Sequence, residues 1–173
     1  KTTDPKTGDT GMFTDAFSGM EVLTGHRGGG FGGGDGFAQN IGWWFTMLGR
    51  GVKWTGTATS DTHRSYSSQA GGARTYVYVG AGNDDVSKLD TKLFATSVKA
   101  GRAVGADGPF VQMWAENGAT KALIGDELAV KASDTVTVTV DVQGPEWMDI
   151  SRVELYVAPT NVVAPPGAGL QEL

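Results

Sequence analysis

The segment 53–63, which reads KWTGTATSDTH, decides how the rest of the chain is organised. It contains a strand-like run up to Thr59 and then places a carboxylate, Asp61, and an imidazole, His63, two residues apart. Just past the end of a strand, two such side chains can turn to the same side of a loop, where both can ligate one metal ion or share a proton. A D-x-H triplet also fits an ordinary solvated loop, so its surroundings must decide between the two interpretations.

The sequence before this segment predicts a strand followed by a helix. Residues 19–23 (GMEVL) are typical of a short buried strand, and a glycine-rich loop at 28–36 follows. Asp35 is the expected N-cap of an amphipathic helix that ends at Gly49 or Gly51. The apolar stripe of this helix falls at positions i, i+4, i+7, i+8 and i+11, which are Phe37, Ile41, Trp44, Phe45 and Leu48.

The order strand, loop, helix, strand is typical of α/β proteins. In parallel α/β sheets and barrels, active sites lie at the carboxyl ends of the strands. Asp61 and His63 follow the carboxyl end of the second predicted strand, so their position favours a functional site over a solvated loop.

The second half of the chain begins with a strand and a helix. Segment 74–79 alternates like a half-buried strand. Ser87 and Asp90 have capping-box-like spacing ahead of apolar residues, and Gly101 follows them, which predicts a helix over 88–100.

From 109 to 157 the pattern is that of β structure. Strands are expected at 110–114, 135–142 and 152–157, and Asn117-Gly118 is a strong hairpin-turn signal. This spacing fits a small antiparallel sandwich.

The expected fold class is therefore α+β, with an α/β segment ahead of an antiparallel β-sandwich. Residues 1–72 hold the α/β segment that ends in the Asp61/His63 loop, residues 73–160 hold the sandwich-like module with one helix, and residues 161–173 form a Pro/Gly-rich tail. At 173 residues the chain is long enough to bury a core.

Composition argues against several classes of function. A formal net charge of -5, without any run of Lys and Arg, disfavours nucleic acid and anionic membrane surfaces as partners. The absence of cysteine excludes disulfides, zinc–thiolate sites and thiol catalysis. No apolar run approaches the length needed to span a membrane. The chain opens at Lys1 without a signal peptide, so we expect a processed chain or a piece whose true start lies elsewhere.

Residues 44–51 (WFTMLGRG) and 55–63 (TGTATSDTH) carry a resemblance to a known family. They resemble the W-x-x-L-L-N-R-G helix end and the S-D-S-H strand end of the polymerase-and-histidinol-phosphatase (PHP) superfamily, most closely its CehA/McbA-like metal-dependent hydrolases. Glu21-Val22 is similar to the E-V of the penultimate strand of the family's barrel. Landmarks of the β-module that follows this barrel are similar to Arg74-Thr75-Tyr76-Val77, Gly101-Arg102, Gly108-Pro109, Gly125-Asp126 and the segment 153–157.

The resemblance implies the C-terminal part of a PHP-type barrel followed by a β-module, with Asp61 and His63 as metal ligands and catalytic pair. It also implies metal-assisted hydrolysis of a phosphoester, an ester or an amide. The divalent cofactor, Zn, Mn or Fe, would lower the pKa of a bound water and polarise the phosphoryl or carbonyl oxygen. A PHP site needs more histidines than the two of this chain. The upstream part of the same protein or a second chain is expected to supply them.

Three further residues are candidates for the site. Arg64 and Arg74 could face an anionic substrate, although a surface or inter-domain ion pair is the more ordinary role for either arginine. His26 is a candidate extra ligand, with a solvated loop histidine as the alternative.

A second hypothesis needs no catalysis. The chain would then be an extracellular binding or structural assembly protein, secreted or periplasmic, with a degenerate barrel remnant; Thr/Val-rich strands, glycine loops and the lack of cysteine fit this hypothesis. A third, that the β-module binds carbohydrate, rests on aromatic residues such as Trp114 and Trp147.

Overall fold

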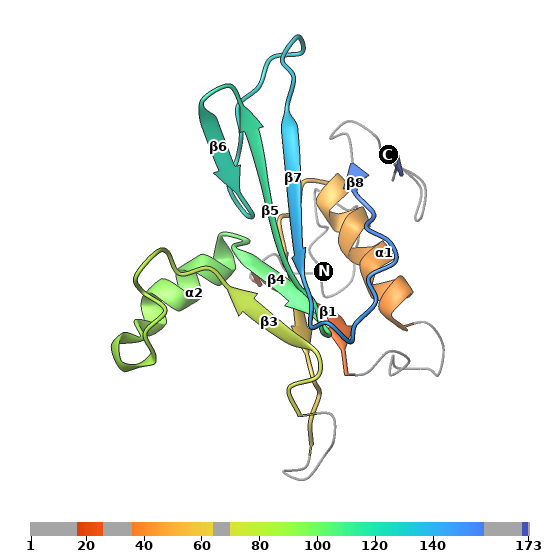
Figure 1. Ribbon diagram of the computed structural model, residues 1–173, viewed down its shortest axis with the longest axis vertical. Coiled ribbons are helices and arrows are strands. Elements are labelled where there is room, and N and C mark those ends of the chain that lie inside the picture. The colour runs from red at the N-terminus through yellow and green to blue at the C-terminus, as the bar shows by residue number, and fades with distance from the viewer. Residues whose placement is uncertain (1–16, 26–35, 64–69, 158–170, 173) are drawn as a thin grey trace, which may run out of the picture.

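The computed structural model describes residues 17–25, 36–63, 70–157 and 171–172, and in them helices and small sheets are mixed (Figure 1). The helices are α1 (Gly36–Gly49), the 3-10 turn η1 (Val86–Lys88) and α2 (Thr91–Lys99). The strands are β1 (Gly19–Thr24), β2 (Thr55–Thr59), β3 (Arg74–Val77), β4 (Ala103–Ala106), β5 (Phe110–Asn117), β6 (Thr120–Leu123), β7 (Thr137–Gln143), β8 (Tyr156–Val157) and β9 (Gln171–Glu172).

The first unit is a parallel strand pair with a helix between its strands. β1 pairs with β2 in parallel, from Gly19 opposite Thr55 to Thr24 opposite Thr59. Parallel neighbours need a long crossover connection, and α1 lies in that connection. The predicted strand, helix and second strand are therefore confirmed. The predicted cap, Asp35, lies outside the described residues.

One indole holds α1 against β2. Trp44 reaches from the helix and donates its Nε1 hydrogen to the Trp54 carbonyl oxygen, 2.7 Å away. Its ring covers Gly56, where a Cβ atom would lie only 2.9 Å from Trp44 Cζ2. A side chain at position 56 would therefore push the helix off the strand. The glycine sets how closely α1 packs.

Strands β3 and β4 cover the remaining edge of β2. They form an antiparallel pair, from Arg74 opposite Ala106 to Val77 opposite Ala103. The Thr75 hydroxyl accepts a hydrogen bond from Ala58 N at 2.9 Å and donates one to Ala58 O at 2.8 Å. One side chain thus satisfies both backbone groups of a buried strand residue, as backbone polar groups away from water require.

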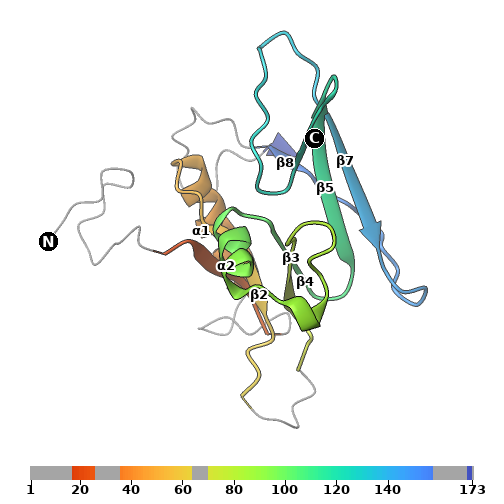
Figure 2. The ribbon, with the colours of Figure 1, turned by 90° about the vertical axis from the view of Figure 1, so that its left-hand side faces the viewer.

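The largest sheet has the order β6-β5-β7. The β5–β7 ladder is antiparallel from Phe110 opposite Gln143 to Glu116 opposite Thr137. β5 and β6 form the hairpin predicted at Asn117-Gly118, with Gly118 at φ +59°. The long strands of this sheet rise above both α1 and α2 in the two ribbon views (Figures 1 and 2).

Several predicted boundaries are wrong. The helix expected over 88–100 begins at Thr91, because Asp90 is its N-cap and accepts the backbone N–H groups of Lys92 and Leu93. The strand expected over 152–157 is reduced to β8, which finds a partner only in the two-residue β9. Strand β4, with its sequence AVGA, was not predicted, because its pairing with β3 is what makes it a strand.

The α+β class is confirmed at this level. The described residues form three sheets of two strands and one of three strands. These sheets are compatible with the α+β class, but they do not show a barrel or a β-sandwich.

A contact between two glycines joins the end of α2 to the end of β6. Gly101 and Gly125, both at positive φ, lie back to back, and a Cβ atom at Gly125 would come within 2.7 Å of the Gly101 carbonyl carbon. Beside them Arg102 Nη2 lies 3.0 Å from Asp126 Oδ1, and Asp126 Oδ2 accepts the Leu123 N–H. The end of α2 is thereby tied to the end of β6, and the two glycines allow the close approach.

We expect Gly56→Ala to lower the free energy of unfolding by about 1–3 kcal/mol, because the added methyl group overpacks against the Trp44 ring. The matched control is Gly42→Ala within α1, where a Cβ atom meets nothing within 4 Å. This control should stabilise by about 0.5–1 kcal/mol, since alanine is the better helix former. Urea denaturation measures both. Equal effects would contradict the Trp44–Gly56 packing.

We expect Gly125→Ala to destabilise more than Gly118→Ala. Both positions have positive φ, which costs alanine about 1–2 kcal/mol. Only the methyl group at position 125 also meets backbone atoms, whereas position 118 is open. Thermal unfolding followed by circular dichroism should give a lower Tm for Gly125→Ala. If the two Tm values coincide, the contact with Gly101 is not tight in solution.

Candidate functional site

The candidate site lies where β1 and β2 both end. The Gly25 N–H donates to the Thr59 carbonyl oxygen at 2.8 Å, which extends the strand pairing one residue past β1. The position that a Cβ atom of Gly25 would take lies 4.0 Å from Asp61 Cβ. The carboxyl ends of the two parallel strands therefore meet beside Asp61, as the sequence predicted for an α/β site.

Asp61 turns the chain at this edge. Its φ of +50° is the only positive φ of a non-glycine residue in the described part of the chain. Aspartate tolerates this left-handed conformation better than most residues, and such conformations often occur at functional sites. After the turn, His63 Nε2 lies 3.1 Å from Asp61 Oδ1. The two predicted site residues are thus brought together.

The spacing and exposure of this pair fit a metal ion. Two ligands at about 2.0–2.2 Å from one ion, at angles between a right angle and a tetrahedral one, lie roughly 3–3.5 Å apart. The pair has this separation, and its side chains are 83% (His63) and 53% (Asp61) exposed. Within the described ranges, however, no group of three or more His, Cys, Asp or Glu side chains is placed to hold a metal. The pair by itself therefore offers two potential ligands, and its 3.1 Å contact is equally that of an ordinary ion pair.

The other predicted site residues are placed differently. The Arg74 guanidinium donates to the Gly71 carbonyl at 3.1 Å and lies 5.7 Å from the Tyr76 ring centroid. Both contacts are within its own stretch of chain and point to a structural role. Arg64 and His26 lie outside the described residues, so their roles stay predictions.

Sequence reasoning missed Glu21 as a residue of this edge. Its carboxylate accepts a hydrogen bond from the Thr59 hydroxyl, across from β1 to the last residue of β2. Only the parallel register brings these two residues together, and the register is not visible in the sequence. In the structure, Glu21 pairs with Thr57, which puts Thr59 on the same face as Glu21, so the sequence alone held no signal for this contact.

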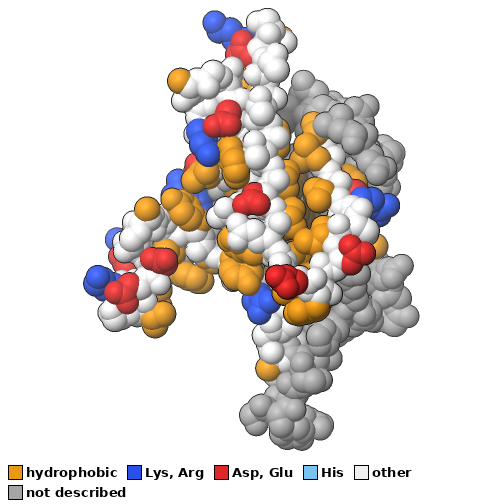
Figure 3. All heavy atoms as spheres, in the orientation of Figure 1, with side chains coloured by type: hydrophobic (Ala, Val, Ile, Leu, Met, Phe, Trp, Pro, Cys, Tyr) orange, Lys and Arg blue, Asp and Glu red, His pale blue; other side chains and the backbone are white. Residues whose placement is uncertain are grey.

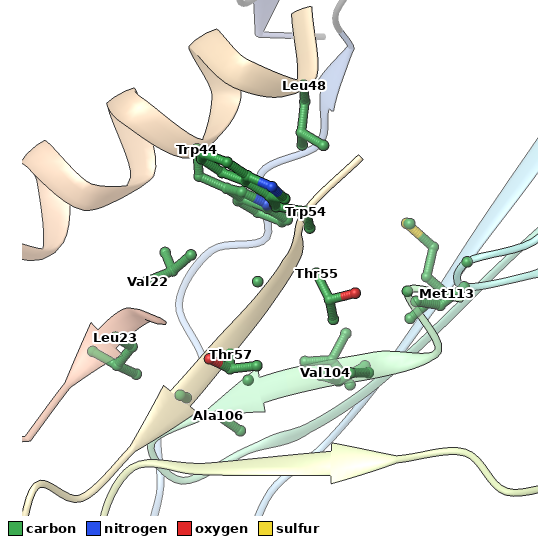
Figure 4. Close-up of a pocket in the computed structure, with 18 of the residues that line it drawn as sticks. Val22, Leu23, Trp44, Leu48, Trp54, Thr55, Thr57, Val104, Ala106 and Met113 are labelled. Carbon is green, nitrogen blue, oxygen red and sulfur yellow. Dashed lines mark hydrogen bonds between the residues drawn. The ribbon is translucent and has the colours of Figure 1, made fainter. Parts of the chain in front are cut away.

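A wide apolar hollow of about 1020 Å³ lies away from this pair, between α1, β2, β4 and β5. Trp44 and Leu48 line it from α1 and Met113 lines it from β5, on opposite sides (Figure 4). Hydrophobic side chains also gather on the molecular surface between the long sheet and α1 (Figure 3).

The buried core beside the hollow is made of small residues. None of the described side chains is less than 2% exposed, and the buried apolar residues are small: Val22, Val52, Ala58, Ala73, Ala106 and Ala122. Among the described residues, several larger apolar side chains, such as Trp44, Leu48 and Met113, line the open space instead of filling a core.

An ion pair lies at the rim of the hollow. Lys53 Nζ contacts Glu127 Oε1, and both residues line the space. The hydrogen bond from Lys53, and then its positive charge, lower the pKa of the Glu127 carboxyl. Both side chains are exposed, so solvent screens the pair and it contributes little to stability.

The tryptophans divide into structural and exposed ones. Lys121 Nζ lies 4.1 Å from the Trp114 ring centroid, and Trp114 Nε1 donates to Glu116 at 3.3 Å. One face of Trp114 is therefore covered, which weakens its case as a sugar platform. Trp147 is 81% exposed, and Trp43 is 54% exposed.

Comparison with known proteins found no match, whether among family models, curated proteins or solved structures. The resemblance to PHP hydrolases therefore stays a prediction. In the part of the chain that the structure describes, no helix is long and apolar enough to cross a membrane.

We expect Thr75→Val to lower the free energy of unfolding by about 1–3 kcal/mol, because Ala58 N and O would be left buried without a partner. Thr75→Ser keeps the hydroxyl and should cost much less. Urea titration of both variants checks this, and similar losses for serine and valine would show that the methyl group matters instead.

Proposed function

We propose that this chain supplies the last two protein ligands, Asp61 and His63, to the divalent metal centre of a hydrolase. The observation that carries the proposal is the 3.1 Å separation of Asp61 Oδ1 and His63 Nε2 at the carboxyl edge of a parallel strand pair.

The chain's own residues have distinct roles in this proposal. Asp61 and His63 hold one ion, and the left-handed turn at Asp61 keeps their donor atoms on one side. Thr62 Oγ1 donates to Ser60 Oγ at 2.9 Å, which stiffens the loop between strand and histidine. A bound divalent ion supplies a water of lowered pKa and polarises a phosphoryl or carbonyl oxygen.

The remaining ligands would come from further polypeptide, either the upstream part of the same protein or a second chain. A catalytic zinc ion typically has three protein ligands, and no group of three or more ligating side chains is placed together among the described residues. The apolar hollow supports the same conclusion, since large side chains such as Trp44 and Met113 line it without closing it.

The same proposal extends to the fold. The β1-α1-β2 unit would be the closing part of a PHP-type barrel, and the strands from β3 onward would form its β-module. The parallel orientation of β1 and β2 supports the first assignment, because two-stranded parallel sheets rarely stand alone. The antiparallel β6-β5-β7 sheet supports the second.

A second candidate function is assembly without catalysis. The exposure of Trp147 (81%) and Val86 (88%) favours it, because large exposed apolar side chains often mark protein contacts. This function would need no metal, and bound metal therefore separates the two candidates.

We expect Asp61→Ala and His63→Ala each to lower the amount of divalent metal bound by the intact protein. The loss of affinity should be at least about tenfold, the lower limit for removing even an indirect partner of a ligand. Elemental analysis after dialysis against buffered Zn²⁺ or Mn²⁺ measures it.

The matched control is Asp84→Ala, which removes an exposed carboxylate outside the site. It should leave the metal content unchanged. Equal metal content in all the variants and in the unaltered protein would sink the hydrolase proposal and leave the assembly function ahead.

A further inference from the structure

An irregularity in β1 lies next to the candidate site. The register of β1 and β2 shifts between Glu21, which pairs with Thr57, and Leu23, which pairs with Ala58. Three residues of β1 thus oppose two of β2, which is the arrangement of a β-bulge. Bulges are rare between parallel strands, and they often occur beside active sites, where they re-aim a side chain.

Glu21, the residue at which the bulge begins, contacts the end of β2 through its carboxylate. Glu21 Oε1 accepts a hydrogen bond from Thr59 Oγ1. Thr59 is the last residue of β2, two residues before Asp61, and its carbonyl oxygen accepts the Gly25 N–H. Thr59 is therefore held by its side chain and by its backbone, both times from the β1 side.

We propose that Glu21 is a positioning residue of the Asp61–His63 site. Resting on the proposed function, this inference assigns to Glu21 a role that acts through Thr59 and needs no contact with the metal. The hydrogen bond fixes the last residue of β2, from which the chain turns at Asp61. Through this hydrogen bond, Glu21 sets where the two donor atoms of the pair lie.

The alternative role of Glu21 is that of a third ligand. The geometry of the described residues argues against a ligand role for Glu21, because no three ligating side chains are grouped there. A ligand would also act by its charge, whereas a positioning residue acts by accepting one hydrogen bond. Variants that separate charge from hydrogen bonding therefore decide between the two roles.

The test measures the Zn²⁺ dissociation constant of the intact protein by competition with a chelator. Glu21→Ala and Thr59→Val should each raise it by about tenfold, the lower end of the effect of losing a direct hydrogen-bond partner of a ligand, because they act one step further from the metal. The double variant should be no worse than either single one, because both remove the same bond. Glu21→Gln keeps an acceptor oxygen and should stay close to the unaltered protein.

Thr57→Val is the matched control. It removes the neighbouring hydroxyl on the same strand, which donates to the Met20 carbonyl at 3.2 Å, but leaves the end of β2 alone. Its Zn²⁺ dissociation constant should be unchanged. Full affinity in Thr59→Val, or equal losses in Glu21→Gln and Glu21→Ala, would overturn the positioning role.

A second measurement does not depend on the metal. In the metal-free protein, the imidazole NMR signals of His63, assigned with a His26→Asn variant, should shift in Thr59→Val and not in Thr57→Val. If Asp61→Ala leaves the bound metal unchanged while these signals shift, the hydrolase proposal fails and the anchor stands. If the His63 signals do not shift in Thr59→Val, the positioning role of Glu21 fails whatever the metal content.

Discussion

The contact of Trp44 with β2 is the constraint on which the first half of the structure depends. The indole donates to the Trp54 carbonyl and covers Gly56, so it fixes both the distance and the rotation of α1 relative to the strand. A parallel strand pair is possible only with such a crossover. The carboxyl ends of β1 and β2 come together because the crossover through α1 returns the chain to the end of the sheet at which β1 begins, so that β2 runs in the same direction.

The site inherits its geometry from that arrangement and from few local contacts. Asp61 lies at the edge because β2 ends there, and it faces His63 because its own backbone is left-handed. On the far edge of β2, Thr75 satisfies Ala58, which keeps the strand in place without a third ladder. Both side chains of the Asp61–His63 pair are nevertheless exposed.

Local patterns in the sequence predicted the parts that local chemistry decides. The apolar stripe of α1, the Gly101 helix end and the Asn117-Gly118 turn each depend on residues close in sequence. What could not be predicted depends on pairing across the chain. β4 becomes a strand because β3 lies beside it, and Glu21 reaches Thr59 through a parallel register with a bulge.

The separation of partners along the chain has a kinetic consequence. The β5–β6 hairpin joins neighbours across a tight turn, so its loop closes early and at small entropic cost. The β1–β2 pair joins Gly19 to Thr55 and closes a much longer loop at a larger entropic cost. The strand ends next to Asp61 thus depend on a pairing that is long in sequence, and exposed strand ends open locally before core strands do. In hydrogen exchange, this edge would lose its amide protection before the β5–β7 ladder does.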